Sequence, residues 1–175
     1  MNINRRSVIK YFVLISAGTI FLPSCKNDNK KNSAAFKNIP IDEDQQATLA
    51  EIAETIIPAT DTPGAKEVSA HLFALQMLND CYTQNDRDKF IKGMKQFEDN
   101  VEKKYKKTFT ECSVSEREAI VAAANSQMDK EDDDTFFFKT LKQLTVRAYT
   151  NSKYYLTNVE VYRLVPGKYI SSKAV

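Results

Sequence analysis

Apolar residues recur at intervals of three and four along most of the chain, which is the spacing of one face of an α-helix. The expected inward residues are Leu49, Ile52, Ala53 and Ile56, then Val68, Leu72, Leu75 and Leu78, then Phe90, Met94, Phe97, Val101 and Tyr105, then the Ala-rich segment through Ala124, and finally Phe137, Leu141, Leu144 and Ala148. No series of alternating strands and no internal repeat is visible in the sequence. The pattern therefore predicts an all-α, compact bundle of about five helices with an irregular C-terminal tail.

Start and stop signals give the expected bounds of these helices. The first helix has Asp42 or Asp44 as its cap and ends at Pro58, and the second runs from about Glu67 to Cys81. Asn85-Asp86 opens the third, and a capping box at Ser113–Glu116 opens the fourth. The acidic run at 129–134 starts the last long helix, which Asn151-Ser152 ends or restarts. The stretch from Val159 to Tyr169 has no clear period and finishes in a Pro-Gly turn.

The first 25 residues have the features of an export signal. Arg5, Arg6 and Lys10 precede an apolar run, Tyr11 to Leu22, that is too short for a permanent membrane span and typical of a signal peptide. Leu22-Pro23-Ser24-Cys25 has the form of a lipobox, so we expect the Cys25 thiol to carry a diacylglyceryl group after cleavage. An ordinary signal peptide or a short anchor helix is the alternative.

The arginine pair adds a second expectation about export. The segment NRRSVIK, with Arg5 and Arg6, matches a twin-arginine signal, and that route carries proteins that are already folded. The alternative is a general secretory signal that happens to contain two arginines. We expect residues 1–24 to be the signal peptide, 25–40 a polar flexible tether and 41–175 the helical domain, anchored by lipid at the periplasmic face of the cell envelope.

Net charge argues against a nucleic-acid partner. The chain has 25 basic and 23 acidic residues, and the expected signal peptide contains three of the basic residues and none of the acidic ones. The mature chain is therefore nearly neutral, and composition gives no support for nucleic-acid binding. The lysines from Lys103 to Lys107 are expected to be the solvated end of a helix.

Two cysteines remain once Cys25 is assigned to the lipid. Cys81 and Cys112 would meet in a compartment where disulfides persist, so we expect them to form one, closing a loop of about 30 residues. The alternative is two buried free thiols.

The sequence offers little support for catalysis or for a metal site. His71 is the single histidine, and its position in a helix beside Leu72 favours a packed or interface role. Asp132, Asp133 and Asp134 could bind a metal, but three acids at a helix start are more often a cap and a solvated end. No glycine pattern cradles phosphates and no haem-attachment motif occurs, so we expect no cofactor in this chain.

The segment IIPATDTPGA is the most distinctive part of the chain. Asp61 resembles the aspartate of aspartic proteases, but those proteins are all-β and need two such residues. A structural role fits better: Asp61 or Thr62 can accept the first free amides of the next helix, or fold an Asx turn. Pro63-Gly64 is expected to form a tight turn in which Gly64 adopts a positive φ. We therefore expect a shaped connector between two helices.

Four stretches resemble the gluconate 2-dehydrogenase subunit 3 family. They are AETIIPATDTPGAKEV, LNDCYTQNDRDKFIKGM, FFFKTLKQLTVRAYTNS and YRLVPGKY, and the similarity runs from about Leu49 to Tyr169. The resemblance implies a non-catalytic small subunit of a periplasmic sugar or sugar-acid dehydrogenase. The large subunit would be a flavoprotein of the glucose-methanol-choline oxidoreductase class that carries FAD, and a cytochrome c subunit would accept the electrons.

Within this hypothesis the chain helps the large subunit fold, accompanies it through the twin-arginine pore and tethers it to the membrane. The expected partner-binding residues are Pro58, Asp61, Thr62, Pro63, Gly64, Phe136, Phe138, Tyr149, Pro166, Gly167 and Tyr169. For Phe136 and Phe138 ordinary core packing is an equal alternative. A stand-alone lipoprotein that binds a ligand or a protein is the second hypothesis, and an enzyme using Asp61, Glu67 or His71 is the third.

Overall fold

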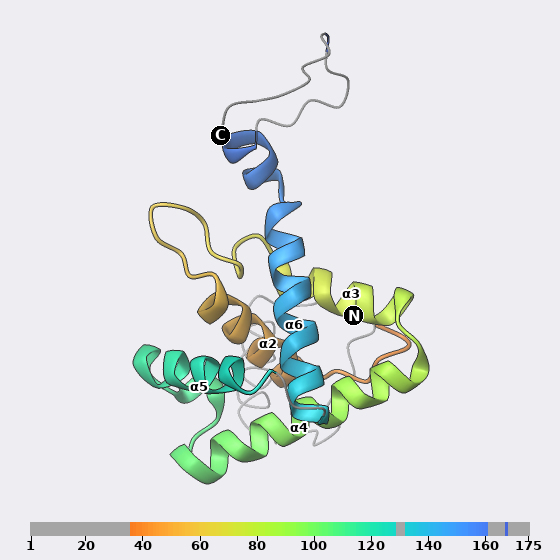
Figure 1. The fold of residues 1–175 in the computed structure, drawn as a ribbon, viewed down its shortest axis with the longest axis vertical. Helices are drawn as coiled ribbons and strands as arrows, with labels where there is room; N and C mark the ends of the chain where they lie inside the picture. The colour runs from red at the N-terminus through yellow and green to blue at the C-terminus, as the bar shows by residue number, and fades with distance from the viewer. Residues whose placement is uncertain (1–35, 129–131, 161–166, 168–175) are drawn as a thin grey trace, which may run out of the picture. The chain divides into compact units, whose positions relative to one another are not determined.

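The computed structural model describes residues 36–128, 132–160 and 167 (Figure 1). All of them belong to one compact unit, Lys31–Val175. The elements are α2 (Glu43–Ile56), α3 (Ala70–Cys81), α4 (Gln84–Tyr105), the 3-10 turn η2 (Phe109–Glu111), α5 (Val114–Ser126), α6 (Asp133–Thr150) and the π-helical turn η3 (Tyr155–Val159). No strand occurs among these residues, so the all-α prediction is confirmed. None of the described helices is long and apolar enough to span a membrane.

Local capping signals set most helix starts where the sequence predicts them. Asp42 accepts from Gln45 N at 2.8 Å, and Ser113 forms the expected capping box with Glu116. Asp132 accepts from Thr135 N at 2.7 Å at the start of α6. Each such cap stabilises a helix by roughly 1 kcal/mol. The third helix differs slightly, because Thr83 rather than Asn85-Asp86 provides its cap.

The start of α3 departs from the sequence prediction. The helix begins at Ala70 and not near Glu67, because Ser69 adopts a left-handed conformation with φ 57° and makes no side-chain cap. The helix buries Leu75 and Leu78 as expected. Leu72, however, is 41% exposed and does not point inward.

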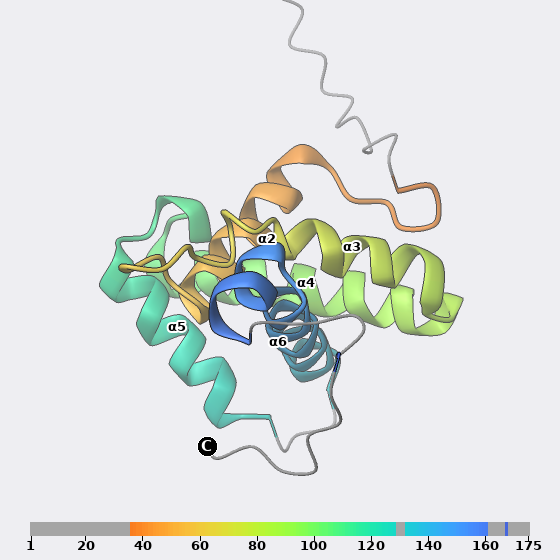
Figure 2. The same cartoon turned by 90° about the horizontal axis from the view of Figure 1, so that it is seen from above.

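Helix α6 is the element around which the others pack. It crosses α4 near its own N-terminal end, contacts α3 and α2, and has α5 on the opposite side from α3 (Figures 1 and 2). The crossing with α4 is close at Gly93, where an added Cβ would lie 1.9 Å from the carbonyl oxygen of Asp133. Only glycine allows the two backbones to approach this closely.

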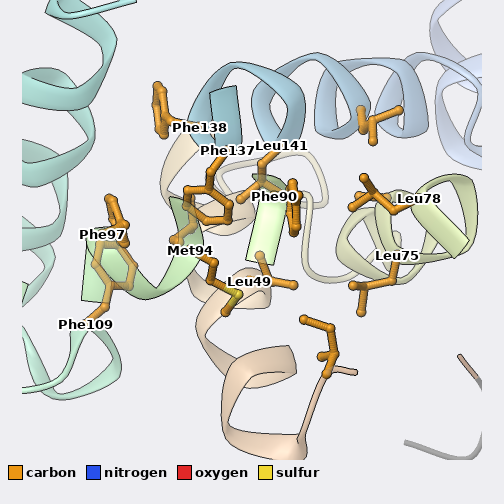
Figure 3. Packing of buried hydrophobic residues seen from close by; sticks show 14 of the residues in the cluster. Leu49, Leu75, Leu78, Phe90, Met94, Phe97, Phe109, Phe137, Phe138 and Leu141 are labelled. Carbon is orange, nitrogen blue, oxygen red and sulfur yellow. The ribbon is translucent and has the colours of Figure 1, made fainter. Parts of the chain in front are cut away.

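Aromatic rings fill the centre of the core. Phe90 of α4 meets Phe137 of α6 edge to face with ring centroids 4.9 Å apart (Figure 3). Phe97 lies 5.6 Å from both Phe137 and Phe109, which attaches η2 to the same cluster. Such ring pairs contribute about 0.5–1.5 kcal/mol each beyond their buried area.

The folded part begins earlier than the sequence suggests. Phe36 and Ile39 are 7% and 1% exposed and belong to the core. Asn38 N donates to Asn79 Oδ1 at 2.8 Å, and Asn38 Nδ2 donates to Asn79 O at 3.0 Å. The boundary expected at Pro40 is therefore too late. The expected signal residues Arg5 and Arg6 and the expected lipid site Cys25 lie outside the described residues.

Candidate functional site

The loop between α2 and α3 is closed at its base by backbone hydrogen bonds. Ala65 N donates to Ile57 O and Ala70 N donates to Ala65 O, both at 2.9 Å. Within the loop, Thr60 N donates to Thr62 O at 2.9 Å. The stem rests on a cluster of small buried side chains: Ala53, Ala65, Ala70 and Ala148. Small residues let the stem lie close against α6, so the loop leaves the body in a fixed direction.

The carboxylate of Glu54 braces the loop from inside. One oxygen accepts from Ala59 N at 2.8 Å and the other accepts from Lys66 N at 2.9 Å. The two amides lie on opposite sides of the loop, and neither has a backbone acceptor among the described residues. A hydrogen bond to a charged acceptor is stronger than a neutral one. One side chain therefore fixes both arms of the loop.

Gly64 lies directly against this carboxylate. An added Cβ would be 2.4 Å from each Glu54 oxygen and 2.7 Å from Ala59 N. No glycine among the described residues has a positive φ, so the expectation that Gly64 needs one was wrong. The position requires glycine because a carboxylate occupies the space of a side chain.

The tip of the loop is exposed and carries a single charged side chain. Residues 58–61, which include Pro58, are exposed, and the Asp61 carboxylate accepts from Thr60 Oγ1 at 3.0 Å. Thr62 and Pro63 are half-buried. The prediction that Asp61 or Thr62 caps the next helix was wrong, because α3 starts only at Ala70. Asp61 is instead presented to solvent on a braced backbone.

Tyr149 ties the end of α6 to this loop. Its hydroxyl donates to Pro63 O at 3.0 Å, and its ring meets that of Tyr155 at 6.2 Å. The two residues are 86 positions apart in sequence, so only the fold brings them together. The structure thus places two of the expected partner-binding segments, the loop and Tyr149, on one surface.

A second carboxylate, Glu51, links the loop to α5. It pairs with Lys66 at the end of the loop and with Arg117 of α5. Arg117 also donates to the carbonyl oxygens of Phe109 and Thr110. Burial acts to raise the pKa of the Glu51 carboxyl, but the two cations outweigh it and hold that pKa below its ordinary value.

His71 lies near the same network, close enough to Lys66 for its charge to act on the imidazole. It is half-buried, and its Nδ1 is buried with no hydrogen-bond partner. Burial lowers the pKa of His71, and the charge of Lys66 lowers it further, so both effects favour the neutral imidazole. Among the described residues no cluster of three His, Cys, Asp or Glu side chains could hold a metal.

The other expected partner-binding residues differ in how far they are exposed. Phe138 is 1% exposed in the core, so as folded it cannot present its ring to a partner. Phe136 is half-buried, with Lys89 Nζ 5.9 Å from its ring centroid. Gly167 is exposed. Pro166 and Tyr169 lie outside the described residues.

The expected disulfide is not formed. Cys81 is an exposed free thiol and Cys112 a buried one. Cys81 precedes the start of α4, whereas Cys112 follows η2, whose Phe109 packs on Phe97. From Gln84 to Phe97 the helix rises about 20 Å. A disulfide needs Cα atoms within about 7 Å, so α4 keeps the two thiols apart.

Glu54, Glu51 and Arg117 are the site residues that sequence reasoning missed. The available signal was a pair of glutamates three residues apart near the end of α2, beside a loop rich in amides that lack helical partners. Nothing in the local pattern indicates that Glu54 turns toward a glycine ten residues later.

Comparison with known proteins gives one match. No curated protein and no solved structure is similar to the chain. The model of the family described as gluconate 2-dehydrogenase subunit 3 matches residues 43–167. The match begins at the first residue of α2 and includes the whole braced loop, α6 and Tyr149. The chain therefore belongs to the gluconate 2-dehydrogenase subunit 3 family.

Proposed function

We propose that this chain is a non-catalytic accessory subunit that binds the catalytic subunit of a flavin-dependent sugar or sugar-acid dehydrogenase through the Glu54-braced loop. The family fits an accessory subunit of a dehydrogenase. The observation that supports the loop as the contact is its construction: an exposed tip held by one carboxylate, two backbone closures and Tyr149. A rigid loop loses little conformational entropy when a partner binds it.

The proposal assigns the chemistry to the partner. FAD would be held by a catalytic subunit of the glucose-methanol-choline oxidoreductase class, and a cytochrome c subunit would accept the electrons. The chain would assist folding of the catalytic subunit, travel with it through the twin-arginine pore and tether it through a lipid on Cys25. A domain that folds around its own core before export suits a route that carries folded proteins.

The first test is affinity capture of the C-terminally tagged chain from detergent-solubilised native membranes. We expect a stoichiometric flavoprotein, identified by mass spectrometry and by flavin absorbance. A chain that is recovered alone from cells expressing the candidate dehydrogenase would contradict the proposal, and would favour a stand-alone binding lipoprotein.

A second test separates the loop from the rest of the surface. Asp61→Arg reverses the charge at the tip without touching the Glu54 brace, and Asp99→Arg makes the same change at an exposed site of α4. We expect the first variant to recover less dehydrogenase than the second, with equal helical content by circular dichroism. Equal recovery would show that the loop tip is not the contact.

A further inference from the structure

His71 lies at the joint between the braced loop and α3. It is the second residue of α3 and follows Ser69, whose left-handed backbone ends the loop. A backbone hydrogen bond closes the stem of the loop (residues 64–70) directly before it, because Ala70 N donates to Ala65 O at 2.9 Å. A change in the charge of His71 therefore acts on the segment that holds the loop in place.

One ring nitrogen of His71 is enclosed by the protein. The side chain as a whole is half-buried, but Nδ1 is buried and has no hydrogen-bond partner among the described residues. A neutral imidazole can keep its proton on Nε2, so a bare Nδ1 needs no acceptor, whereas an imidazolium has an N–H on both nitrogens. Protonation therefore creates a buried donor without an acceptor, and such a donor favours a conformation in which water reaches it.

The electrostatic surroundings of the imidazole are positive. The first turn of α3 contains no acidic residue, and Ser69 provides no side-chain cap, so the positive end of the helix dipole is uncompensated there. Lys66 brings a second positive charge and is fixed in place, since its Nζ pairs with Glu51 and its backbone N donates to Glu54 at 2.9 Å. Burial lowers the pKa of His71, and the Lys66 charge lowers it further. All three effects oppose protonation while the loop is closed.

The helices packed against α3 offer the imidazole no bonded carboxylate within the described part of the chain. α2 carries Glu51 and Glu54 at the loop, and both already accept from Lys66. Glu67 of the loop is exposed. α6, the other helix packed against α3, carries a further cation, Arg147, in its last turn. Of these charges, that of Lys66 acts on the imidazole, and it repels a proton.

We propose that His71 is a pH-sensitive latch on the braced loop: the neutral imidazole keeps the stem closed, and protonation opens it. The proton comes from solvent and resides on Nδ1 in the opened form, where water can accept from it. Because the opened form takes up the proton more readily, the closed form has its full stability above the ordinary histidine pKa of about 6.5 and loses it progressively as pH falls below that value. Binding at the loop would weaken in acid, and that consequence alone rests on the proposed function.

Amide hydrogen exchange of the full chain, read by mass spectrometry, tests the latch against His71→Gln. Glutamine is polar but takes up no proton, so comparison at equal pH removes the intrinsic pH dependence of exchange. From about pH 7.5 to about pH 5.5 we expect the stem amides of the wild type to exchange increasingly faster than those of the variant, up to about tenfold per pH unit for one proton. Amides of α4 should exchange equally in both proteins. A wild-type to variant ratio at the stem that stays constant with pH would overturn the proposal.

A second measurement needs no substitution at His71. Since the chain has a single histidine, exchange of its imidazole C2 proton reports the charge of His71 directly. We expect the stem to open in step with the charging of His71. Lys66→Met removes the cation but keeps the backbone amide that binds Glu54, so it should raise the pKa of His71 and reduce the pH dependence of opening. A His71 that becomes fully charged while the stem amides stay protected would overturn the proposal.

Capture of the dehydrogenase subunit at both pH values separates this inference from the proposed function. We expect the wild type to lose more of its partner in acid than His71→Gln does. If the stem opens in acid but capture does not change, the latch stands and the loop is not the contact. If the wild type captures no dehydrogenase at either pH, the proposed function fails, while the exchange measurements still decide for or against the latch.

Discussion

One methyl group added at Gly64 tests the central structural argument of the loop. In Gly64→Ala the new Cβ would stand 2.4 Å from both carboxylate oxygens of Glu54 and 2.7 Å from Ala59 N. Gly64 has no positive φ, so alanine brings no backbone strain of its own. The cost must come from displacing the carboxylate and from the close contact with Ala59 N.

The size of this cost follows from the two bonds that the carboxylate accepts. Displacement breaks the hydrogen bonds from Ala59 N and Lys66 N, 2.8 and 2.9 Å long. Because both bonds are accessible to water, each contributes about 1 kcal/mol, the usual net value for a protein hydrogen bond. We therefore expect Gly64→Ala to lower the free energy of unfolding by about 2 kcal/mol. With a urea slope of about 2 kcal/mol/M, the midpoint falls by about 1 M.

Urea unfolding followed by circular dichroism, in a double-mutant cycle with Glu54→Ala, measures the effect. Without the carboxylate the contact with Ala59 N at 2.7 Å remains, so Gly64→Ala should cost less in that background. Gly167→Ala is the control, because a Cβ there has no atom within 4 Å. If the loss of unfolding free energy in the double mutant equals the sum of the two single-mutant losses within about 0.5 kcal/mol, the reasoning is refuted, because Gly64 and Glu54 would then act independently.

Further predictions concern the surroundings of the loop and the thiols. Tyr149→Phe removes the hydrogen bond to Pro63 O, so it should lower the free energy of unfolding in urea by about 1 kcal/mol and speed amide hydrogen exchange in the loop. Unchanged exchange would show that this hydrogen bond does not hold the loop. The depressed pKa of Glu51 adds stability that is present above its unfolded-state pKa of about 4.3 and is lost as pH falls through the folded value. Stability measured against pH should therefore fall less steeply on acidification in Glu51→Gln than in the wild type, and identical slopes would contradict this. Cys81 should react with a maleimide in the native protein, whereas Cys112, whose thiol pKa burial raises, should react only after unfolding. If neither thiol reacts with the maleimide in the absence of a reductant, even after unfolding, the two cysteines form a disulfide.

Local signals in the sequence determined where most helices start. Asp42, Ser113 and Asp132 cap helices because a side-chain oxygen reaches an amide three residues ahead, which needs no distant contact. The all-α class and the central aromatic stripe of α4 follow from periodicity in the same way. Family resemblance likewise depends on motifs that are contiguous in sequence.

Side chains whose surroundings come from several elements could not be placed in this way. Phe136 and Phe138 flank Phe137 in sequence, yet Phe138 is buried because α6 has neighbours on more than one side. Leu72 had the right spacing but lies on the exposed side of α3, because the face that packs inward is formed by Ala70, Ala74, Leu75, Leu78 and Asn79.

Only the tertiary structure decided how the loop and the cysteines are arranged. Gly64 is required by a carboxylate ten residues away, and Tyr149 reaches Pro63 across 86 positions. Cys81 and Cys112 are separated by a rigid helix, which sequence spacing cannot reveal. The sequence by itself determined the helices, because their hydrogen bonds and caps are local. The fold decided the surface, because each contact there joins residues whose distance depends on how the helices pack.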